Sequence, residues 1–388
     1  MTISEVARLR HPDTIRRQSE RMLALATQGR LERWDINLGR LPDLGRMVGE
    51  LTRVRYPDLA VPMHGRRLHF RVGDVDLWEN RPRPADRDEA ARSDVGLIVV
   101  SVLLDAGSGP RWRYTDTEIQ GELSRSEGLA VASFRAWERG VFSSRGLPRV
   151  DSEVLSGVGA ASLAQAFQVR EDNPLVGTED RAALLRSLGR VSSRWPSRRV
   201  GGLFDLLSGH ASSTGRLSAV TLLRTLLEQL SPLWPDSTMR DGQHLGDVWP
   251  YPPLGLMPFH KLTQWLAYSL IEPLHAAGIT VTEVDRLTPL AEYRNGGLLI
   301  DGGVLTPVTP GWRTTSHPVS SSLVVEWRAL TVALVGRLAE LVREDLGARL
   351  SMAQILEGGT WAAGRRLAAA ARPDARPPVN VASNGTIF

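Results

Sequence analysis

The sequence predicts a mainly α-helical protein: a single large domain with a few short strands or hairpins. Most of its 388 residues fall into segments with apolar residues at helical spacing, separated by Gly, Ser and Pro. No linker stands out and no repeat with a period of about 20–50 residues is present, although a subdivision into 1–150 and 151–388 stays open. A hydrophobic content of 42% and a charged content of 23% are ordinary for a soluble globular chain.

The N-terminal part begins with a predicted helix over 14–27, which Asp13 caps and Gly29 closes. A second helix is expected at 41–53. Residues 56–84 are rich in Pro, His and Arg and favour an ordered loop with a short hairpin. Such a loop can hold an anion through its basic side chains, or it can be a solvated turn. Those side chains are His64, Arg66 and Arg67.

Further helices are predicted through the middle of the chain. Residues 86–105 become fully apolar in GLIVVSVLL, so the second half of that helix is expected to be buried. Residues 125–140 form a helix with Ser126 as N-cap and Gly140 just past the end. Shorter amphipathic helices are expected around 160–168, 179–188, 201–208 and 217–230.

Lys261 is the only lysine in the sequence, so 46 of the 47 Lys and Arg residues are arginine. Arginine is a wide, permanently charged fork, whereas lysine is a compact ammonium whose pKa moves on burial. A site that needs a compact ammonium, or an amine that can lose a proton, cannot accept arginine. We therefore interpret Lys261 as functional; the alternative is a surface lysine that survived by chance.

A helix over 259–272 would carry Lys261, with Pro273 ending or kinking it. One face of this helix is apolar and consists of Leu262, Leu266 and Leu270. The opposite face combines an ammonium, a carboxylate and two aromatic rings with polar tips. Its members are Lys261, Trp265, Tyr268 and Glu272.

The C-terminal part contains the longest predicted helix, over 317–347, in which Glu326 and Arg328 interrupt an apolar run. Charges inside a buried helix require partners or a ligand. Before it, Asn295-Gly296-Gly297 is a strong turn signal, and residues 298–301 are expected to form a short strand. A further helix is predicted at 351–369, followed by a Pro-rich exit and a final strand.

Several classes of function find no support in the sequence. It has no cysteine, no H-x-H or H-E-x-x-H spacing, no Walker loop, no G-x-G-x-x-G after a strand and no G-x-S-x-G elbow. We therefore expect no metal and no cofactor. Basic and acidic residues are interspersed, so no nucleic-acid surface is predicted. Without a signal-peptide h-region or an apolar run of about 18 residues, no membrane partner is expected, and a cytoplasmic location is predicted.

Distinctive motifs follow one another from about residue 10 to the C-terminus. They are YPDLAVPMHGRRLHF, SVLLDAGSGPRWRYTD, RSEGLAVASF, DNPLVG, LGDVW, PFHKLTQWLAYSLIEPL, LTPLAEYRNGGLLIDGGVL, VVEWRALTVAL and ILEGGTWAAGR. In these motifs the sequence resembles the uracil catabolism protein four family of bacteria and fungi. The resemblance implies a place in a uracil-degrading route that passes through a ribosylurea-type intermediate and liberates urea.

Three shorter motifs carry a remoter resemblance: KLTQ at 261–264, LAEYR at 290–294 and EWRA at 326–329. Their order and spacing are similar to K-R-A-Q, F-A-D-Y-R and E-I-R-A in the queuosine 5′-phosphate N-glycosylases. That family has a fold akin to helix-hairpin-helix DNA glycosylases, with a Lys and an Asp at the active site. The resemblance implies the same fold here, with Lys261 and Glu292 as the pair. Glu in place of Asp moves the carboxylate by one methylene.

Together the resemblances imply an N-ribosyl hydrolase that releases urea from ribosylurea or its 5′-phosphate and uses no metal. Cleavage of the C–N bond develops positive charge on the sugar, and a carboxylate can stabilise that charge or activate water. We expect Glu292 to act in this way. Lys261 would position Glu292, hold the phosphate or protonate the leaving urea, and the last role requires a lowered pKa.

The expected partner is a small molecule derived from a nucleoside or nucleotide. The candidate substrate-binding residues are Arg294, Glu326, Arg328, Tyr268, Trp265, Gln264, His260, Asp247, His64, Arg66 and Arg67. The alternative for Arg294 and Arg328 is structural ion pairing with neighbouring acids.

Two other functions remain open. The first is an amidohydrolase that opens a pyrimidine-derived ring in the same pocket and releases no free sugar. The second is a non-catalytic protein that binds a labile intermediate of the route. An exposed patch rich in Trp and Arg would favour binding alone, whereas a buried contact between Lys261 and Glu292 would count against it.

Overall fold

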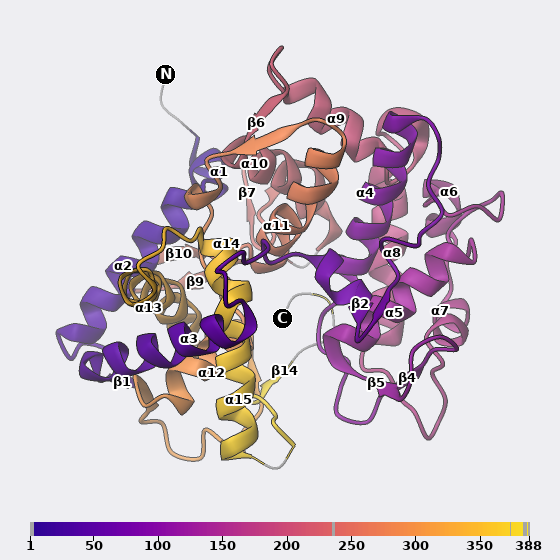
Figure 1. The fold of residues 1–388 in the computed structure, drawn as a ribbon. Coiled ribbons are helices and arrows are strands. Elements are labelled where there is room, and N and C mark those ends of the chain that lie inside the picture. The colour runs from indigo at the N-terminus through magenta and orange to yellow at the C-terminus, as the bar shows by residue number, and fades with distance from the viewer. Residues whose placement is uncertain (1–3, 235–236, 373, 383–385, 387–388) are drawn as a thin grey trace. The chain divides into compact units, whose positions relative to one another are not determined.

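The protein is mainly α-helical, as the sequence predicts (Figure 1). The computed structural model describes residues 4–234, 237–372, 374–382 and 386. Within that part of the chain, the strands pair only in two-stranded sheets. No helix there is long and apolar enough to cross a lipid bilayer. The likeness to helix-hairpin-helix glycosylases stays a prediction.

The chain divides into two compact units, each built from separate stretches of sequence. Unit 1 comprises Met1–His64, Asp247–Gln264 and Glu283–Ala382. Unit 2 comprises Gly65–Gly246, Trp265–Thr282 and Ser383–Phe388. Helix α11 (Lys261–Ala276) therefore contributes its first turn to unit 1 and the rest of its length to unit 2.

The core of unit 1 forms around α13 (Ser322–Leu346), the long helix predicted at 317–347, which begins later than predicted because His317 and Pro318 lie in a strand. It packs against α2 (Pro12–Thr27) and α3 (Leu41–Arg55). Its N-terminal half is buried on all sides, which explains why the segment lacks a clear polar face. Beside it, α12 (Tyr293–Asp301) packs against α15 (Trp361–Ala371).

Short elements complete unit 1. The helical ones are α1 (Glu5–Leu9), η1 (Leu38–Arg40), η5 (Val284–Arg286), α14 (Met352–Ile355) and the π-helical η6 (Leu356–Thr360). The antiparallel strand pairs are β1 (Trp34–Ile36) with β12 (Leu305–Pro307) and β9 (Val248–Tyr251) with β10 (Gly255–Pro258). One parallel pair joins β13 (His317–Pro318) to β14 (Val381–Ala382), the strand predicted near the C-terminus.

Unit 2 contains most of the helices predicted in the middle of the chain. The α-helices are α4 (Arg87–Leu103), α5 (Arg125–Glu138), α6 (Ser152–Ser156), α7 (Ala160–Ala166), α8 (Thr178–Ser192), α9 (Gly202–His210) and α10 (Ala219–Leu230). The 3₁₀ turns are η2 (Arg66–Phe70), η3 (Pro196–Arg198) and η4 (Ser231–Leu233).

The strands of unit 2 form hairpins and one longer-range pair. The hairpin expected within 56–84 is β2 (Arg71–Val72) with β3 (Val75–Asp76). Two others are β4 (Tyr114–Thr115) with β5 (Glu122–Leu123) and β7 (Met239–Arg240) with β8 (Gln243–His244). A parallel pair joins β6 (Arg216–Ser218) to β11 (Thr280–Thr282).

The predicted turn at Asn295-Gly296-Gly297 and the predicted strand at 298–301 are wrong, because all these residues lie in α12. Gly296 serves close packing rather than a turn. A Cβ at Gly296 would lie 2.5 Å from the Trp327 indole of α13, so only glycine fits there. The chain turns later, at Gly302 and Gly303, where Gly303 has a φ of +73°.

Three predicted helix ends also need correction. The N-cap of α2 is His11 rather than Asp13, because Pro12 already lies in the helix and His11 Nδ1 accepts the Asp13 N–H. The residue before α5 is Ser124 rather than Ser126, and the Ser126 hydroxyl donates to Asp105 instead. Pro273 does not end α11, which continues to Ala276.

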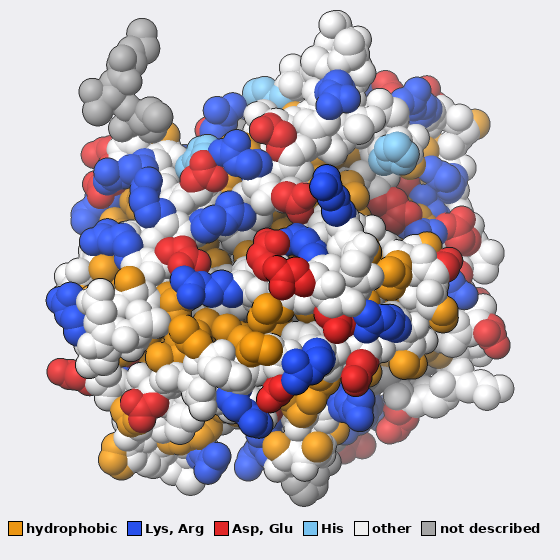
Figure 2. Space-filling view, turned by 60° about the vertical axis from the view of Figure 1, so that its left-hand side comes forward, with side chains coloured by type: hydrophobic (Ala, Val, Ile, Leu, Met, Phe, Trp, Pro, Cys, Tyr) orange, Lys and Arg blue, Asp and Glu red, His pale blue; other side chains and the backbone are white. Residues whose placement is uncertain are grey.

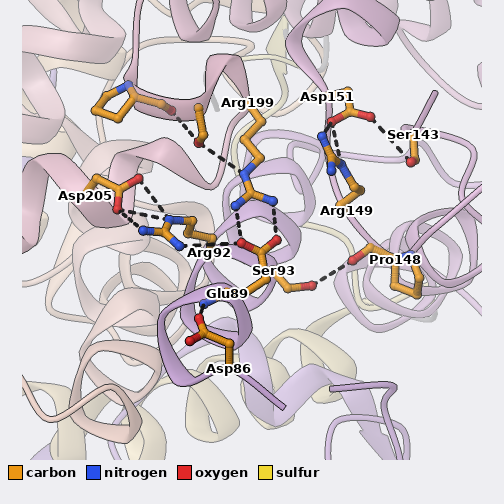
Figure 3. A network of polar contacts seen from close by, with 12 residues as sticks. Asp86, Glu89, Arg92, Ser93, Ser143, Pro148, Arg149, Asp151, Arg199 and Asp205 are labelled. Carbon is orange, nitrogen blue, oxygen red and sulfur yellow. Dashed lines mark hydrogen bonds and ion pairs between the residues drawn. The ribbon is translucent and has the colours of Figure 1, made fainter. Parts of the chain in front are cut away.

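A network of ion pairs fastens α4 to its neighbours inside unit 2 (Figure 3). Arg92 on α4 donates to Asp205 on α9 at 2.7 and 3.0 Å. Glu89 on α4 receives both ends of the Arg199 guanidinium. Arg199 in turn forms an isolated β-bridge with Asp151. These contacts fix three stretches that are far apart in the sequence.

Candidate functional site

The centre of the candidate site in unit 1 is an ion pair between Asp247 and Arg328. Arg328 lies on α13 with an exposed fraction of 1% and donates to both carboxylate oxygens of Asp247 at 2.7 Å. Trp249 Nε1 donates to the same carboxylate at 2.7 Å. Burial alone would raise the pKa of Asp247, but Arg328 and these donors hold it at about 2. The carboxylate is therefore a fixed negative charge.

Asp247 also sets the start of α11. Its side chain accepts the backbone N–H of Lys261 at 2.9 Å, and its carbonyl accepts the N–H of Phe259 at 3.0 Å. The Arg328 guanidinium lies 4.2 Å from the centre of the Phe259 ring. Four hydrogen bonds from three residues fill the Asp247 carboxylate. Asp247 thus positions the first turn of the lysine helix.

His260 is held in a strained conformation immediately before that helix. Its φ of +48° lies in the left-handed region, which non-glycine residues rarely adopt. The ring is 1% exposed, and Nε2 donates to the Leu9 carbonyl at 3.0 Å. Nδ1 has no hydrogen-bond partner among the described residues. Burial lowers the pKa of His260 to about 4, so the ring is neutral at physiological pH, with a buried lone pair on Nδ1.

Glu292, the predicted catalytic acid, caps the N-terminus of α12. One carboxylate oxygen accepts the Arg294 N–H at 2.7 Å and the other accepts the Asn295 N–H at 2.6 Å. The residue is 8% exposed. Burial raises the pKa of Glu292 above its usual value, while the two N–H groups and the charge of Lys261 oppose that rise. Each oxygen keeps a second lone pair, so the carboxylate is oriented but not used up.

Lys261 and Glu292 are thus brought into one neighbourhood of unit 1. Lys261 is the first residue of α11 and is only 9% exposed. Its positive charge favours the ionised form of Glu292. The alternative of a surviving surface lysine is therefore wrong, because the side chain is buried. The catalytic roles of both residues stay predictions.

The side-chain amide of Gln264 forms hydrogen bonds within the protein. Its amide oxygen accepts the Thr288 N–H at 2.9 Å, and its Nε2 donates to Phe259 O and to Thr288 Oγ1. This exchange joins the first turn of α11 to the segment that leads into Glu292. Gln264 thereby aligns Lys261 with Glu292.

Arg294 lies beside Glu292 but forms no ion pair within the described residues. It is 2% exposed, donates from Nη1 to the Ala375 carbonyl at 3.2 Å, and leaves Nε without a hydrogen bond. Its guanidinium lies 5.1 Å from the centre of the Tyr293 ring. A buried cation with spare donors is suited to an anionic or hydroxylated ligand. Structural pairing with an acid, the alternative considered for Arg294, is not seen, whereas it is seen for Arg328.

Glu326 belongs to a separate cluster in unit 1. It is fully buried, and Oε1 accepts from Tyr251 at 3.0 Å and from Arg33 at 3.2 Å. Oε2 has no hydrogen-bond partner in the described part of the chain, and burial raises the pKa of Glu326. Tyr251 and Arg33 carry no sequence signal that would have singled them out.

The basic cluster expected on the 56–84 loop is divided between the two units. In unit 1, His64 Nδ1 lies 2.9 Å from Glu357 Oε2 on the π-helical turn. In unit 2, Arg66 is fully buried and donates to Asp105 at 2.6 Å, and Arg67 pairs with Glu272 at 2.7 Å. All three side chains therefore have carboxylate partners.

Trp265 and Tyr268 lie on the part of α11 that belongs to unit 2. They are 4% and 1% exposed. The Trp265 ring packs edge-on against His69, with centroids 5.7 Å apart. The predicted apolar and polar faces of α11 are thus both buried, and Glu272 is the one exposed residue among the members of these two faces.

No group of three or more His, Asp or Glu side chains that could hold a metal ion occurs in the described ranges. Sequence reasoning missed Trp249, Thr288 and Glu357, which fix Asp247, Gln264 and His64. Trp249 and Thr288 lie within LGDVW and just before LAEYR, so the motifs contained them without revealing their role.

The helical chain thus places a buried Lys–Glu neighbourhood beside an Asp–Arg pair, and buried titratable groups of this kind cluster at functional sites. A family model described as "Protein of unknown function (DUF1688)" matches residues 8–388, so the chain belongs to that family.

Two proteins are similar to this chain over most of its length. The chain is 39% identical over 407 residues to "Protein urg3" of Schizosaccharomyces pombe, with 100% of both chains covered. It is 35% identical over 378 residues to "Uracil catabolism protein 4" of Lachancea kluyveri, with 85% of each covered. The resemblance to the uracil catabolism protein four family is confirmed.

Proposed function

We propose that this protein acts in uracil catabolism as an N-ribosyl hydrolase, releasing urea from ribosylurea or its 5′-phosphate. The name of the Lachancea kluyveri relative supports the pathway. The similarity of KLTQ, LAEYR and EWRA to the queuosine 5′-phosphate N-glycosylase motifs supports the type of reaction. The geometry of Glu292 supports the assignment of this residue as the catalytic carboxylate.

The observation that carries the proposal is the state of the Glu292 carboxylate. Two backbone N–H groups fix its plane, so its free lone pairs keep one direction. Burial raises its pKa and thereby its basicity. An oriented, desolvated carboxylate can stabilise positive charge on a ribosyl carbon or remove a proton from water.

The proposed step is a balanced hydrolysis. The bond between the anomeric carbon and the urea nitrogen breaks, and the nitrogen keeps the electron pair. Water adds to the anomeric carbon, and Glu292 takes the proton that this water loses. The leaving nitrogen takes up a proton, and we assign Lys261 as the donor. The products are ribose, or ribose 5-phosphate, and urea.

Buried neighbours would hold the substrate. Arg294 offers an unused Nε donor next to Glu292, suited to a sugar hydroxyl or a phosphate oxygen. His260 Nδ1 offers an unused acceptor one residue before Lys261. The burial of Lys261 and Glu292, and the charge interaction between them, favour catalysis over binding alone.

The test is incubation of the purified protein with ribosylurea and, separately, its 5′-phosphate, with urea and reducing sugar assayed together. We expect equimolar urea and sugar from one of the two compounds. In Glu292→Gln the rate should fall about 10²- to 10⁴-fold, the usual contribution of a general acid or base. The amide oxygen of the substituted side chain still accepts one N–H, so the α12 cap is partly kept.

The matched control is Glu344→Gln, which makes the same change at an exposed position of α13. Its rate should equal that of the wild type. No release of urea or sugar from either compound would overturn the glycosidic step. Opening of a pyrimidine-derived ring and a non-catalytic binding role would then remain.

A further inference from the structure

Unit 1 contains a second polar feature, which neither Lys261 nor Glu292 lines. A hollow of about 420 Å³ lies between α1, α2 and the start of β10. This volume lies within the range of small-molecule sites, roughly 300–1,000 Å³. Neither Lys261 nor Glu292 lines it, so its occupant does not depend on the proposed reaction.

The lining of this hollow is strongly basic. Arg8, Arg17 and Arg21 contribute three guanidinium groups, and Glu5 is the one acid among the lining residues. Glu5 lies 3.6 Å from Arg8. Arg17 and Arg21 form no ion pair with any acid in the described residues. Among the described residues, the lining of the hollow therefore carries an excess of positive charge.

Hydrogen bonds orient the two unpaired arginines. They are one turn apart on α2, so both project from one face of the helix. Arg17 donates to Thr14 Oγ1 at 3.3 Å, and Arg21 donates to Gln18 Oε1 at 2.8 Å. Each bond uses one terminal nitrogen and leaves the other donors of the fork available.

The wall of the hollow is equally fixed. Gln18 is 9% exposed, and its Nε2 donates to the carbonyls of Leu254 and Leu256, at 3.0 and 3.2 Å. Between them, Gly255 has a φ of +81°, a conformation that glycine adopts without strain. The β9–β10 connection is thus fastened to α2, and a ligand would meet a preformed surface.

We propose that this hollow binds the phosphate group of a phosphate monoester of metabolite size, such as a sugar phosphate. Paired arginine forks match the oxygens of a phosphate, and the guanidinium is less strongly hydrated than an ammonium. The remaining volume accommodates the organic part of the ligand. The site is distinct from the one assigned to the hydrolytic reaction.

The test is isothermal titration calorimetry of the full-length protein at low ionic strength, with glucose 6-phosphate, inorganic phosphate and glucose as probes. Because Arg294 beside Glu292 is also suited to a phosphate oxygen, the substitutions of Arg17 and Arg21, rather than binding alone, assign the ligand to this hollow. We expect glucose 6-phosphate to bind and glucose not to bind. Added salt should weaken the binding, because exposed charges are screened.

Arg17→Gln and Arg21→Gln should each weaken binding of glucose 6-phosphate roughly tenfold, as expected for the loss of hydrogen bonds to a charged group. The matched control is Arg30→Gln, at an exposed position beyond the end of α2. It removes the same charge outside the hollow and should leave affinity within about twofold, because exposed charges are screened beyond a Debye length.

Each outcome bears on the proposal. Equal affinity for inorganic phosphate and glucose 6-phosphate would support it and assign recognition to the phosphate alone. Tighter binding of the sugar phosphate would support it and show that the sugar contributes. Failure of both phosphate compounds to bind, or unchanged affinity in Arg17→Gln and Arg21→Gln, would overturn it.

Discussion

Lys261 occupies a buried position, and an arginine there would be a wider, permanently charged fork. The side chain is 9% exposed, and its charge acts on Glu292. We predict that Lys261→Arg abolishes urea release but leaves the protein folded. The fold should survive because the variant keeps the backbone N–H of Lys261, which binds Asp247. Urea release and near-ultraviolet circular dichroism would measure the two effects.

The control for this exchange is Arg376→Lys, which makes the reverse change at a position where the side chain is 71% exposed. It should alter neither activity nor the dichroism spectrum. A Lys261→Arg protein with full activity would refute the argument from the single lysine. An unfolded variant would be replaced by Lys261→Met, which is also unbranched and carries no charge.

The sequence could place Lys261 and Glu292 together only through motif similarity. It could not separate Glu326 from Arg328, which stand two residues apart. Two residues along a helix correspond to about 200° of rotation. Glu326 therefore contacts Tyr251 and Arg33, whereas Arg328 contacts Asp247. Nor could it show that His64 and Arg66 fall in different units.

At the scale of secondary-structure elements, the contact between α12 and α13 depends on Gly296. A Cβ at this position would meet three atoms of the Trp327 indole at 2.5–2.6 Å. We predict that Gly296→Ala lowers the free energy of unfolding by about 1–3 kcal/mol, the usual cost of overpacking. Urea denaturation followed by tryptophan fluorescence would measure it.

Gly336→Ala is the matched control, because Gly336 lies inside α13 and a Cβ there meets nothing within 4 Å. Alanine forms helix better than glycine, so this variant should gain about 0.5–1 kcal/mol. If both substitutions shifted stability equally, glycine propensity rather than packing would explain Gly296.

The same glycine shows why part of the fold escaped prediction. Asn-Gly-Gly is a turn signal when judged locally, yet Trp327, about thirty residues later, requires a residue without a side chain there. Long helices such as α2, α3 and α13 were predictable because local signals reveal a helix: apolar residues within the segment, or start and stop residues at its ends. The predicted cap at Ser126 was wrong for a similar reason. Its hydroxyl donates to Asp105, which is distant in sequence, so local rules could not reveal this partner.

At the scale of the whole molecule, charge is distributed rather than concentrated. Figure 2 shows basic and acidic side chains interspersed over the face in view. With 47 Lys and Arg against 43 Asp and Glu, most arginines have an acid available. The buried pairs, such as Arg81 with Asp94, connect segments inside one unit. Composition predicts the balance, but only the fold determines which charges meet.

Low pH should therefore lower the stability of the folded protein, because carboxylates that are ion-paired in the fold become protonated. Arg328 and other donors hold the pKa of Asp247 at about 2, against 3.8 in a free side chain. His64 and Arg55 hold the pKa of Glu357 at about 2, against 4.5. A lowered folded-state pKa means that the unfolded chain binds more protons. The stabilisation is complete above about pH 5 and is lost as the pH falls towards 2.

We predict that the free energy of unfolding falls between pH 5 and 2, with Asp247 contributing about 2 kcal/mol and Glu357 about 3 kcal/mol of the loss. Glu292 and Glu326 oppose it, because burial raises their pKa and so favours the folded state at low pH. Urea denaturation at pH 7, 5, 4 and 3 would measure the net slope. Glu357→Gln removes one of the carboxylates whose pKa the fold lowers, so the stability of this variant should be lower at pH 7 and depend less on pH. Parallel profiles for this variant and the wild type would contradict the assignment, since the pairing of Glu357 with His64 would then contribute nothing to the acid sensitivity of unit 1.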